Sequence, residues 1–256
     1  MKKSTKKVGI IGCGWLGIRL AKHLMTQFQV FTTTTSEKKK IDLERLGIPT
    51  WVVNFDSDKG LKPNENWLGL DAIIITVPFS KSHNVEQLKE RFKTLSKFIQ
   101  GFPKQVFLMS SVGIYPQMNQ KITEANLDKT QLNPTILAVE NLMKKQFPQI
   151  NILRLGGLMG DDRYISKYKI SEPNQIVNHI HFDDIVNIIE KMIDENWNTK
   201  KYNLVAPLHP TKQEVIDYQT QKVETKIQET YGREISSALL INDLKYQFHH
   251  PDPTKF

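Results

Sequence analysis

A glycine-rich turn near the amino terminus constrains the fold more than any other feature of the sequence. Three glycines with the spacing G-x-G-x-x-G directly follow the apolar run at residues 8–11, and an amphipathic segment begins at Leu16. They are Gly12, Gly14 and Gly17. Between a strand and a helix, such glycines allow a tight bend, close approach of a pyrophosphate and close packing of the helix on the strand. The free N–H groups at the helix N-terminus also attract phosphate, so the sequence predicts a dinucleotide-binding turn.

Short apolar runs alternate with helical patterns along the first 160 residues, as repeated βα units require. The run at residues 71–77 is apolar on both faces, which indicates a parallel strand covered by helices on each side. Strands are expected at residues 8–11, 29–33, 51–55, 71–77, 106–110 and 150–155. The predicted fold class is α/β, a doubly wound parallel-sheet Rossmann fold.

The alternating pattern loosens beyond Gly160, where residues 161–175 are polar. We expect a dinucleotide-binding Rossmann core at residues 1–160, to which residues 178–206 return. Residues 161–177 and 207–256 are expected to form a small, partly interleaved C-terminal cap that contains the substrate region.

Local signals mark several helices. Ser36 is expected to cap a helix that Gly47 ends, and a long helix is expected at residues 84–99. Pro134 is a favoured first residue of another helix. Thr211 and Glu214, three residues apart, have the spacing of a capping box.

The chain carries a formal charge of +8 and a pI near 9.3, which raises the question of a nucleic-acid partner. Its lysines are dispersed along the chain, and no nucleic-acid-binding motif accompanies them. We therefore interpret the charge as a solubilising surface together with a site for an anionic cofactor, and we predict no nucleic-acid partner.

No apolar run approaches the roughly 20 residues that span a bilayer, so no membrane partner is predicted. The basic residues 1–7 lead into a short strand and the glycine turn, without the apolar stretch of a signal peptide. Cys13 is the only cysteine in the sequence, which suits the reducing cytoplasm that we expect for this chain.

Five later segments carry a further signal. They are VFLMSSVGIYP at residues 106–116, RLGGLMG at 154–160, HFDDI at 181–185, YNLV at 202–205 and YQFHHP at 246–251. In their order and spacing they resemble the extended short-chain dehydrogenase/reductases, the NAD(P)-dependent epimerase/dehydratase group. The last segment is similar to the ending of small, atypical members known as nucleoside-diphosphate-sugar epimerases, and the resemblance covers nearly the whole chain.

This resemblance implies where a nicotinamide cofactor and its substrate would lie. Ser111 falls at the position of the serine that hydrogen-bonds the reacting substrate oxygen. Asp56 falls near the adenine, residues 76–78 pass the ribose and nicotinamide, and residues 155–156 border the nicotinamide and substrate. Together with the turn and the end of the second strand, the predicted cofactor-binding set is Gly12, Gly14, Trp15, Leu16, Gly17, Thr34, Thr35, Ser36, Lys38, Asp56, Thr76, Val77, Pro78, Ser110, Leu155 and Gly156.

Two departures from the family pattern bear on the chemistry. Extended members usually carry G-x-x-G-x-x-G in the turn, so this turn indicates an atypical branch. Aligning Glu140 with the family's helix glutamate places Leu132 and Ile136 at the positions of its Tyr-x-x-x-Lys pair, and neither side chain can move a proton. Tyr115, four residues after Ser111, is the candidate for the catalytic acid/base; the alternative is that it is an aromatic plug.

The end of the second strand predicts which dinucleotide binds. NAD-preferring sites place an acidic side chain there, about 20 residues beyond the glycines, to hold the ribose 2′-hydroxyl. This chain has hydroxyls at Thr34, Thr35 and Ser36 instead, followed by Glu37 and by three lysines at positions 38–40, any one of which can supply a charged contact. Lys38 is the one placed in the predicted set. Hydroxyl and ammonium groups can donate to a 2′-phosphate, so NADP(H) is the predicted cofactor. NAD is the alternative if Glu37 serves as the acidic residue.

Histidines in the last third of the chain raise the question of a metal. His179 and His181 are two residues apart, so they would share a face if this segment formed a strand, and Asp183 is close by; His249 and His250 have no evident third ligand. The family resemblance explains His181 and the aspartates after it as structural. No metal site is therefore predicted.

These observations predict an enzyme that transfers hydride reversibly between NADP(H) and a small sugar-like or other hydroxyl substrate, with a nucleotide sugar as one candidate. Because the Tyr-x-x-x-Lys pair is absent, the alternative is a non-catalytic NADP-binding redox sensor or scaffold. A dehydrogenase outside this superfamily would also fit the glycine spacing and Pro78, but the chain after Val205 is short for the helical C-terminal domain that it would need.

Overall fold

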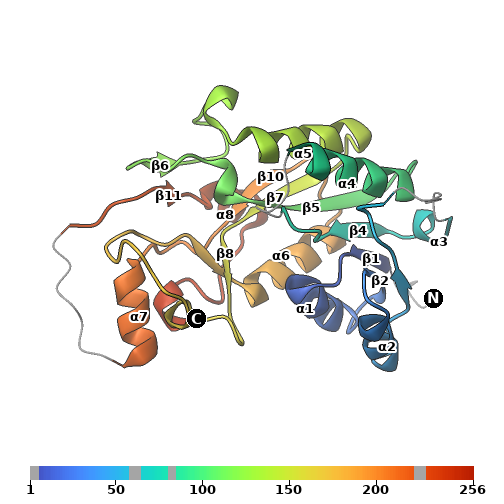
Figure 1. Cartoon of the computed structure of the whole chain (residues 1–256), viewed down its shortest axis with the longest axis horizontal. Helices are drawn as coiled ribbons and strands as arrows, with labels where there is room; N and C mark the ends of the chain where they lie inside the picture. Colours follow the sequence, from blue (N-terminus) through green and yellow to red (C-terminus); the bar gives the residue numbers. More distant parts are fainter. Residues whose placement is uncertain (1–5, 58–64, 80–84, 222–228) are drawn as a thin grey trace. The chain divides into compact units, whose positions relative to one another are not determined.

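The computed structural model of the chain describes residues 6–57, 65–79, 85–221 and 229–256 (Figure 1). Most of the basic segment at residues 1–7, and residue 84 of the expected long helix, lie outside these ranges. No helix among the described residues is both long enough and apolar enough to cross a membrane.

A seven-stranded sheet organises the fold, with the strand order β10-β7-β5-β4-β1-β2-β3. β1 pairs in parallel with β2 on one side and with β4 on the other, and parallel pairing continues to β3 and to β5. This order reverses direction between β1 and β4, as in a doubly wound Rossmann fold, so the predicted fold class is confirmed. The strands are β1 (Lys7–Ile11), β2 (Gln29–Thr34), β3 (Thr50–Val52), β4 (Ala72–Ile75), β5 (Gln105–Ser111), β7 (Asn151–Leu155) and β10 (Lys201–Leu204).

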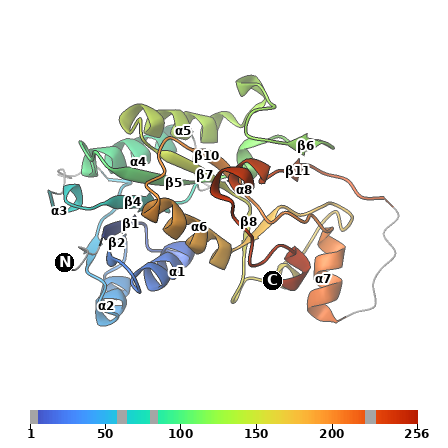
Figure 2. The same ribbon diagram turned by 180° about the vertical axis from the view of Figure 1, so that it is seen from behind.

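Helices cover both faces of this sheet (Figure 1, Figure 2). α1 (Trp15–Leu24) and α2 (Glu37–Arg45) lie on one face, and α4 (Val85–Phe98) and α5 (Pro134–Gln146) lie on the other. All four residues of β4 are buried, because a strand with helices on both sides has no face toward solvent. A short helix, α3 (Glu65–Leu68), precedes β4.

Apolar side chains from the sheet and from α4 and α5 form one large core cluster. Its buried members include Ile73, Ile75 and Val106 from the strands, and Phe92, Leu95, Val139 and Met143 from the two helices. Burying such side chains contributes about 1.5–3 kcal/mol each. The glycine turn and the loop after β4 lie at the carboxyl ends of the central strands.

The chain forms two compact units. Unit 1 comprises residues 1–110, 134–152 and 190–200, and unit 2 comprises residues 111–133, 153–189 and 201–256. The division into core and cap expected from the sequence stays a prediction.

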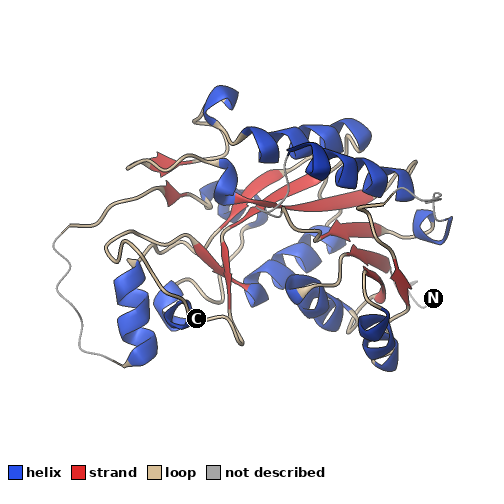
Figure 3. Ribbon diagram, viewed as in Figure 1, coloured by secondary structure: helices blue, strands red, loops and turns tan. Residues whose placement is uncertain are grey.

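Unit 2 contains two short parallel strand pairs that the sequence did not predict (Figure 3). β6 (Lys121–Ile122) pairs with β11 (Glu234–Ile235), and β8 (Gly157–Met159) pairs with β9 (His179–His181). α6 (Phe182–Asp194) begins directly after β9, and α7 (Lys212–Thr220) and α8 (Ala238–Leu244) follow. Short 3-10 helices are η1 (Val112–Ile114), η2 (Lys129–Gln131), η3 (Ile165–Lys167) and η4 (Pro253–Lys255).

Most of the local signals act as expected. The Ser36 hydroxyl accepts the Lys39 N–H at 3.3 Å and caps α2, and Thr211 and Glu214 form a complete capping box at the start of α7. The strand expected at residues 51–55 is wrong at its end, because β3 stops at Val52. The Asn54 side chain accepts the Asp56 N–H at 3.0 Å, and this Asx turn redirects the chain after the strand.

Candidate functional site

The glycine turn connects β1 to α1 through contacts with two other strands. Gly12 has a φ of +93°, which favours glycine, and its N–H donates to the Thr33 hydroxyl at 3.0 Å. The Gly12 carbonyl accepts the Thr76 hydroxyl. A Cβ on Gly17 would lie 2.6 Å from the Gly12 carbonyl oxygen, so only glycine lets α1 start this close to the turn. The end of β2 and the residue after β4 therefore hold the turn in place.

The N-terminus of α1 opens at Gly14. This residue is the N-cap in an extended conformation, and no side chain caps the helix. A Cβ on Gly14 would meet no atom within 4 Å, so its outer side is open space. The first N–H groups of a helix lack intrahelical partners and lie at the positive end of its dipole. This arrangement suits an anionic group such as a pyrophosphate.

A pocket of about 270 Å³ adjoins the turn, and every residue that lines it belongs to unit 1. Eight of its residues belong to the predicted cofactor-binding set: Gly12, Gly14, Thr34, Thr35, Asp56, Thr76, Val77 and Pro78. The others are Cys13, Thr33, Lys39, Val53, Asn54, Phe55 and Arg91. The pocket therefore combines the turn with the ends of β2, β3 and β4.

Three ionisable side chains set the charge of this pocket. Asp56 accepts a bidentate ion pair from Arg91, with Nε–Oδ1 at 2.6 Å and Nη2–Oδ2 at 2.9 Å. Their charges cancel, which leaves the Lys39 ammonium as the net charge of the lining.

Burial raises the pKa of the Cys13 thiol to about 11, although the Lys39 charge opposes the shift. Cys13 is therefore protonated at neutral pH and is a poor nucleophile.

The other half of the predicted cofactor-binding set lies outside this lining. Trp15, Leu16 and Gly17 form the first turn of α1, and Ser36 caps α2. Lys38 is exposed on α2, and Lys39, one residue later, lines the pocket in its place. Ser110 is near the end of β5, and Leu155 and Gly156 are at the end of β7. Lys39 is one of the three lysines that the sequence offered for this contact, although the predicted set named Lys38. Sequence reasoning missed Arg91, which has no local motif and lies 35 residues from Asp56.

Two serines end β5, and their surroundings differ. Ser110 is buried, and its hydroxyl donates to the buried Glu140 carboxylate at 2.6 Å. Ser111 is half-buried, and its hydroxyl oxygen accepts the Gly113 N–H at 3.0 Å. That bond leaves the Ser111 hydroxyl with its own proton to donate. Ser110 is thus tied to α5, whereas Ser111 is the serine that can serve a ligand.

Tyr115 lies within a buried network of unit 2. Its hydroxyl donates to Asn203 Oδ1 at 2.7 Å and accepts from Arg154 Nη1 at 2.8 Å, and the side chain is 4% exposed. Burial raises the pKa of this phenol, with Arg154 and Asn203 opposing the shift. A raised pKa is the opposite of what a tyrosine base needs at neutral pH. These contacts favour the alternative interpretation of Tyr115 as a buried aromatic plug.

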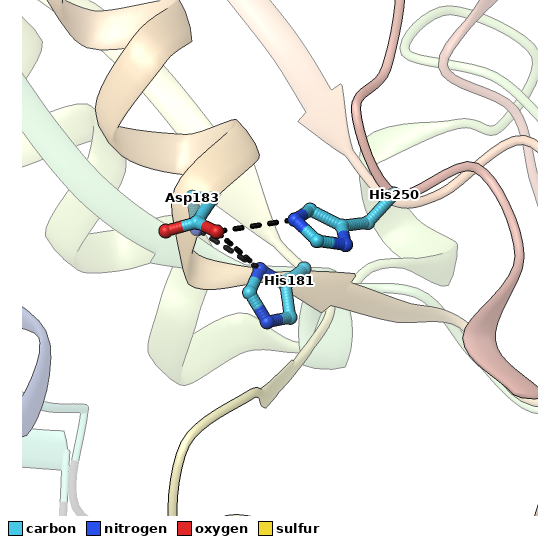
Figure 4. Close-up of side chains that lie close together, drawn as sticks. All are labelled: His181, Asp183 and His250. Atoms are coloured by element: carbon cyan, nitrogen blue, oxygen red, sulfur yellow. Dashed lines mark hydrogen bonds and ion pairs between the residues drawn. The ribbon is translucent and has the colours of Figure 1, made fainter. Parts of the chain in front are cut away.

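A second group of ionisable residues in unit 2 surrounds the start of α6 (Figure 4). His181 Nδ1 lies 3.4 Å from Asp183 Oδ2, and His250 Nε2 lies 3.1 Å from the same oxygen. The sequence had paired His181 with His179 instead. The His179 ring packs against Gly157, its Nδ1 has no hydrogen-bond partner among the described residues, and burial lowers its pKa to about 4.

The chain is similar to known proteins in sequence and in fold. No protein-family model matches the chain. Protein YeeZ of Escherichia coli (strain K12) is 23% identical over 273 residues, an alignment that covers 97% of this chain and 97% of YeeZ.

Three solved structures share the fold. The Bordetella bronchiseptica enzyme WbmG, in complex with NAD, has a TM-score of 0.77 at 12% identity and covers 99% of this chain and 93% of its own. UDP-glucuronic acid 4-epimerase of Bacillus cereus, also with NAD, has a TM-score of 0.72 at 13% identity. The match covers 97% of this chain and 95% of the epimerase. ADP-L-glycero-D-manno-heptose-6-epimerase of Helicobacter pylori has a TM-score of 0.73 at 12% identity. The match covers 100% of this chain and 96% of that epimerase.

Proposed function

We propose that this chain, which has the fold of the NAD-dependent epimerases and dehydratases, binds NADP(H) and transfers hydride to and from a small sugar-like substrate. One observation carries the proposal. The pocket at the carboxyl ends of β1 to β4 joins an open helix N-terminus, a tight glycine turn and a lining with one net positive charge. Ligands of doubly wound sheets bind at this location, where the strand order reverses.

The division of the pocket suggests how each part of the cofactor is held. The pyrophosphate would lie over Gly14 at the start of α1, where a backbone without a Cβ permits close contact. The adenosine half would extend toward Asp56 and Arg91 at the end of β3. Thr76, Val77 and Pro78, which follow β4, would pass the ribose next to the nicotinamide.

The preference for NADP(H) rests on the end of β2. Thr34 and Thr35 line the pocket with hydroxyls, and Lys39 adds an ammonium group from the first turn of α2. These groups can donate to a 2′-phosphate. Among the described residues that line the pocket, the only carboxylate is Asp56, which Arg91 already neutralises. Glu37 is exposed and absent from the lining, so no acidic group there repels the phosphate.

The chemistry would depend on Ser111. When bound, the nicotinamide supplies or accepts the hydride. The Ser111 hydroxyl, oriented by the Gly113 N–H, would donate a hydrogen bond to the substrate oxygen whose carbon loses or gains that hydride. Ser110 would hold the end of β5 in position through its bond to Glu140. A nucleotide sugar is the substrate class that we favour, because solved structures with this fold include epimerases of UDP-sugars.

The test is a screen of the purified chain against nucleotide sugars and simple carbonyl compounds with NADP(H). Dehydrogenation is followed at the nicotinamide absorbance. Epimerisation returns the hydride and gives no net change in absorbance, so the products are also separated by chromatography. We expect NADP(H)-dependent conversion of at least one nucleotide sugar, and failure of the chain to bind NADP(H) would refute the proposal.

A second candidate function is a non-catalytic NADP-binding sensor or scaffold. It is favoured by the apolar Leu132 and Ile136 at the family's proton-transfer positions, and by the internal hydrogen bonds of Tyr115. In that case NADP(H) binds tightly, but no compound in the screen is converted. Cofactor-dependent turnover on any substrate would eliminate this candidate.

A further inference from the structure

Three potential metal ligands converge at the start of α6. His181 ends β9, Asp183 lies in the first turn of α6, and His250 lies 67 residues further along the chain. His181 Nδ1, Asp183 Oδ2 and His250 Nε2 all lie within 4.8 Å of one another. Figure 4 shows that His181 Nδ1 and His250 Nε2 both face the same oxygen of Asp183, Oδ2.

The surrounding structure holds these groups in place before any ligand arrives. The buried Asp184 carboxylate accepts three hydrogen bonds from the C-terminal segment: the Tyr246 hydroxyl at 2.8 Å, the His249 N–H at 2.8 Å and the His250 N–H at 3.0 Å. Asp184 thereby fixes the backbone that carries His250. The His181 ring contacts the Phe182 and Phe256 rings at centroid distances of 4.7 and 5.5 Å, and it stacks on the His250 ring at 3.8 Å.

The protonation of His181 suits a ligand. The Asp183 N–H points at His181 Nδ1 across 3.3 Å, so this nitrogen presents its lone pair and not a proton. A hydrogen bond of that length is weak and is readily exchanged for a metal–nitrogen bond. Neutral imidazole is the form that binds metal ions.

We propose that His181, Asp183 and His250 form a binding site for a divalent transition-metal ion of the Zn²⁺ type. Two imidazoles and one carboxylate are a ligand set that Zn²⁺ uses, with bonds of about 2.0–2.2 Å. Tetrahedral bonds of that length separate neighbouring ligand atoms by roughly 3.3 Å. The observed separations of 3.4 Å and 3.1 Å match two of the three edges. The third pair, His181 Nδ1 and His250 Nε2, lies within 4.8 Å.

The position of the site indicates a structural role. A bound ion would link β9 and α6 to the C-terminal segment that carries His250. The Asp183 and His250 side chains are 42% and 32% exposed, so an ion can enter from solvent and a water can complete its coordination. The proposal is independent of the proposed function, because none of these three residues has a role there.

The test is metal binding by the full chain, with any affinity tag removed and with metal stripped by a chelator. Zn²⁺ is measured by equilibrium dialysis, and Co²⁺ is used as a visible probe because tetrahedral Co²⁺ absorbs strongly. We expect one ion per chain. We also expect a rise in Tm of roughly 5–10 °C when the free Zn²⁺ concentration is 100 times Kd.

Three variants assign the ligands. His250→Gln and Asp183→Asn alter partly exposed groups and should each weaken Zn²⁺ binding by about 100-fold or more. His249→Gln is the matched control: it changes the neighbouring, exposed histidine and should bind like the parent chain. Circular dichroism of each variant verifies that it is folded.

Two outcomes would overturn the proposal. One is that the folded parent chain binds no Zn²⁺ at millimolar concentration, which would make the three residues an ordinary hydrogen-bonded cluster with stacked rings. The other is that His250→Gln or Asp183→Asn retains the parent affinity, which would place any bound ion elsewhere.

Discussion

The glycine turn at residues 12–17 and the segment from Ser111 to Tyr115 both follow central strands of the sheet, yet they differ in how completely they fit the proposed reaction. The turn has the backbone geometry, open helix end and lining charge that a dinucleotide requires. The second segment contains one suitable hydroxyl, Ser111. Its tyrosine is buried with both hydrogen-bonding functions already used.

The difference teaches that cofactor binding and catalysis depend on different kinds of group. Binding at the turn uses N–H groups, a helix dipole and the absence of side chains, so three glycines suffice to specify it. Proton transfer needs particular side chains with suitable pKa values at particular positions. Leu132 and Ile136, which the family resemblance aligns with a Tyr-x-x-x-Lys pair, have apolar side chains and cannot transfer a proton.

Replacing Ser111 gives the largest expected effect and tests the weaker of the two regions. For Ser111→Ala, we expect kcat to fall by about 10²–10³-fold, because one positioned donor to the reacting oxygen is lost. NADP(H) affinity should stay unchanged, since Ser111 does not line the cofactor pocket. Steady-state kinetics together with cofactor titration measures both quantities. Parent-level turnover in this variant would remove Ser111 from the site.

Gly14→Ala tests the stronger region without disturbing the fold. A Cβ at this position meets no atom of the chain within 4 Å, and the backbone is extended with φ of −85°, so the free energy of unfolding should not change. The same methyl group would stand where the pyrophosphate approaches, and we expect NADP(H) affinity to fall by about 10²-fold. Gly69→Ala, whose Cβ would have its nearest neighbour 3.9 Å away, is the matched control and should bind normally. If Gly14→Ala binds NADP(H) as tightly as the parent chain, the pyrophosphate does not lie at the start of α1.

Lys39→Gln tests whether the Lys39 ammonium binds the 2′-phosphate of NADP(H). We expect NADP(H) affinity to fall about tenfold, because a charge-assisted contact to the 2′-phosphate is lost from a partly solvated site. NAD(H) has no such phosphate and should bind equally to both proteins. Lys38→Gln is the control on the same helix and should leave both affinities unchanged. If Lys38→Gln reduces NADP(H) affinity and Lys39→Gln does not, the side chain has been assigned wrongly.

Tyr115→Phe gives the smallest expected effect on catalysis. Removing the hydroxyl leaves Asn203 Oδ1 and Arg154 Nη1 without one buried partner, so the free energy of unfolding should fall by about 1–3 kcal/mol. Turnover should remain near the parent value at every pH. Denaturant unfolding and a pH–rate profile separate the two effects. A loss of turnover with parent stability would instead restore Tyr115 as the acid/base.

Much of the fold could be predicted from the sequence because its signals are local. The positions of the central strands along the chain follow from the apolar runs, and the capping side chains of Ser36 and Thr211 act within three residues of their targets. β6, β8, β9 and β11 are only two or three residues long, which is too short for a periodic pattern to show. Their pairing depends on partners distant in the chain, and no local signal encodes it.

The site was predictable to a similar extent and for similar reasons. The three glycines, and the hydroxyls of Thr34, Thr35 and Ser36 at the end of β2, can be recognised from their spacing in the sequence. Lys38 and Lys39 differ by one step of a helix, about 100° around its axis, which a sequence pattern cannot resolve without the exact helix start. Arg91 reaches Asp56, and His250 reaches Asp183, only through the tertiary fold.

The relative affinity of NADP⁺ and NAD⁺ tests most directly whether this pocket is a dinucleotide site with a 2′-phosphate position. Both cofactors are titrated into the parent chain by isothermal calorimetry at the same ionic strength, because salt screens part of the attraction to Lys39. We predict that both bind at one site per chain and that NADP⁺ binds about tenfold more tightly. Equal affinity, or tighter binding of NAD⁺, would contradict this and would mean that Glu37 turns inward to hold the ribose.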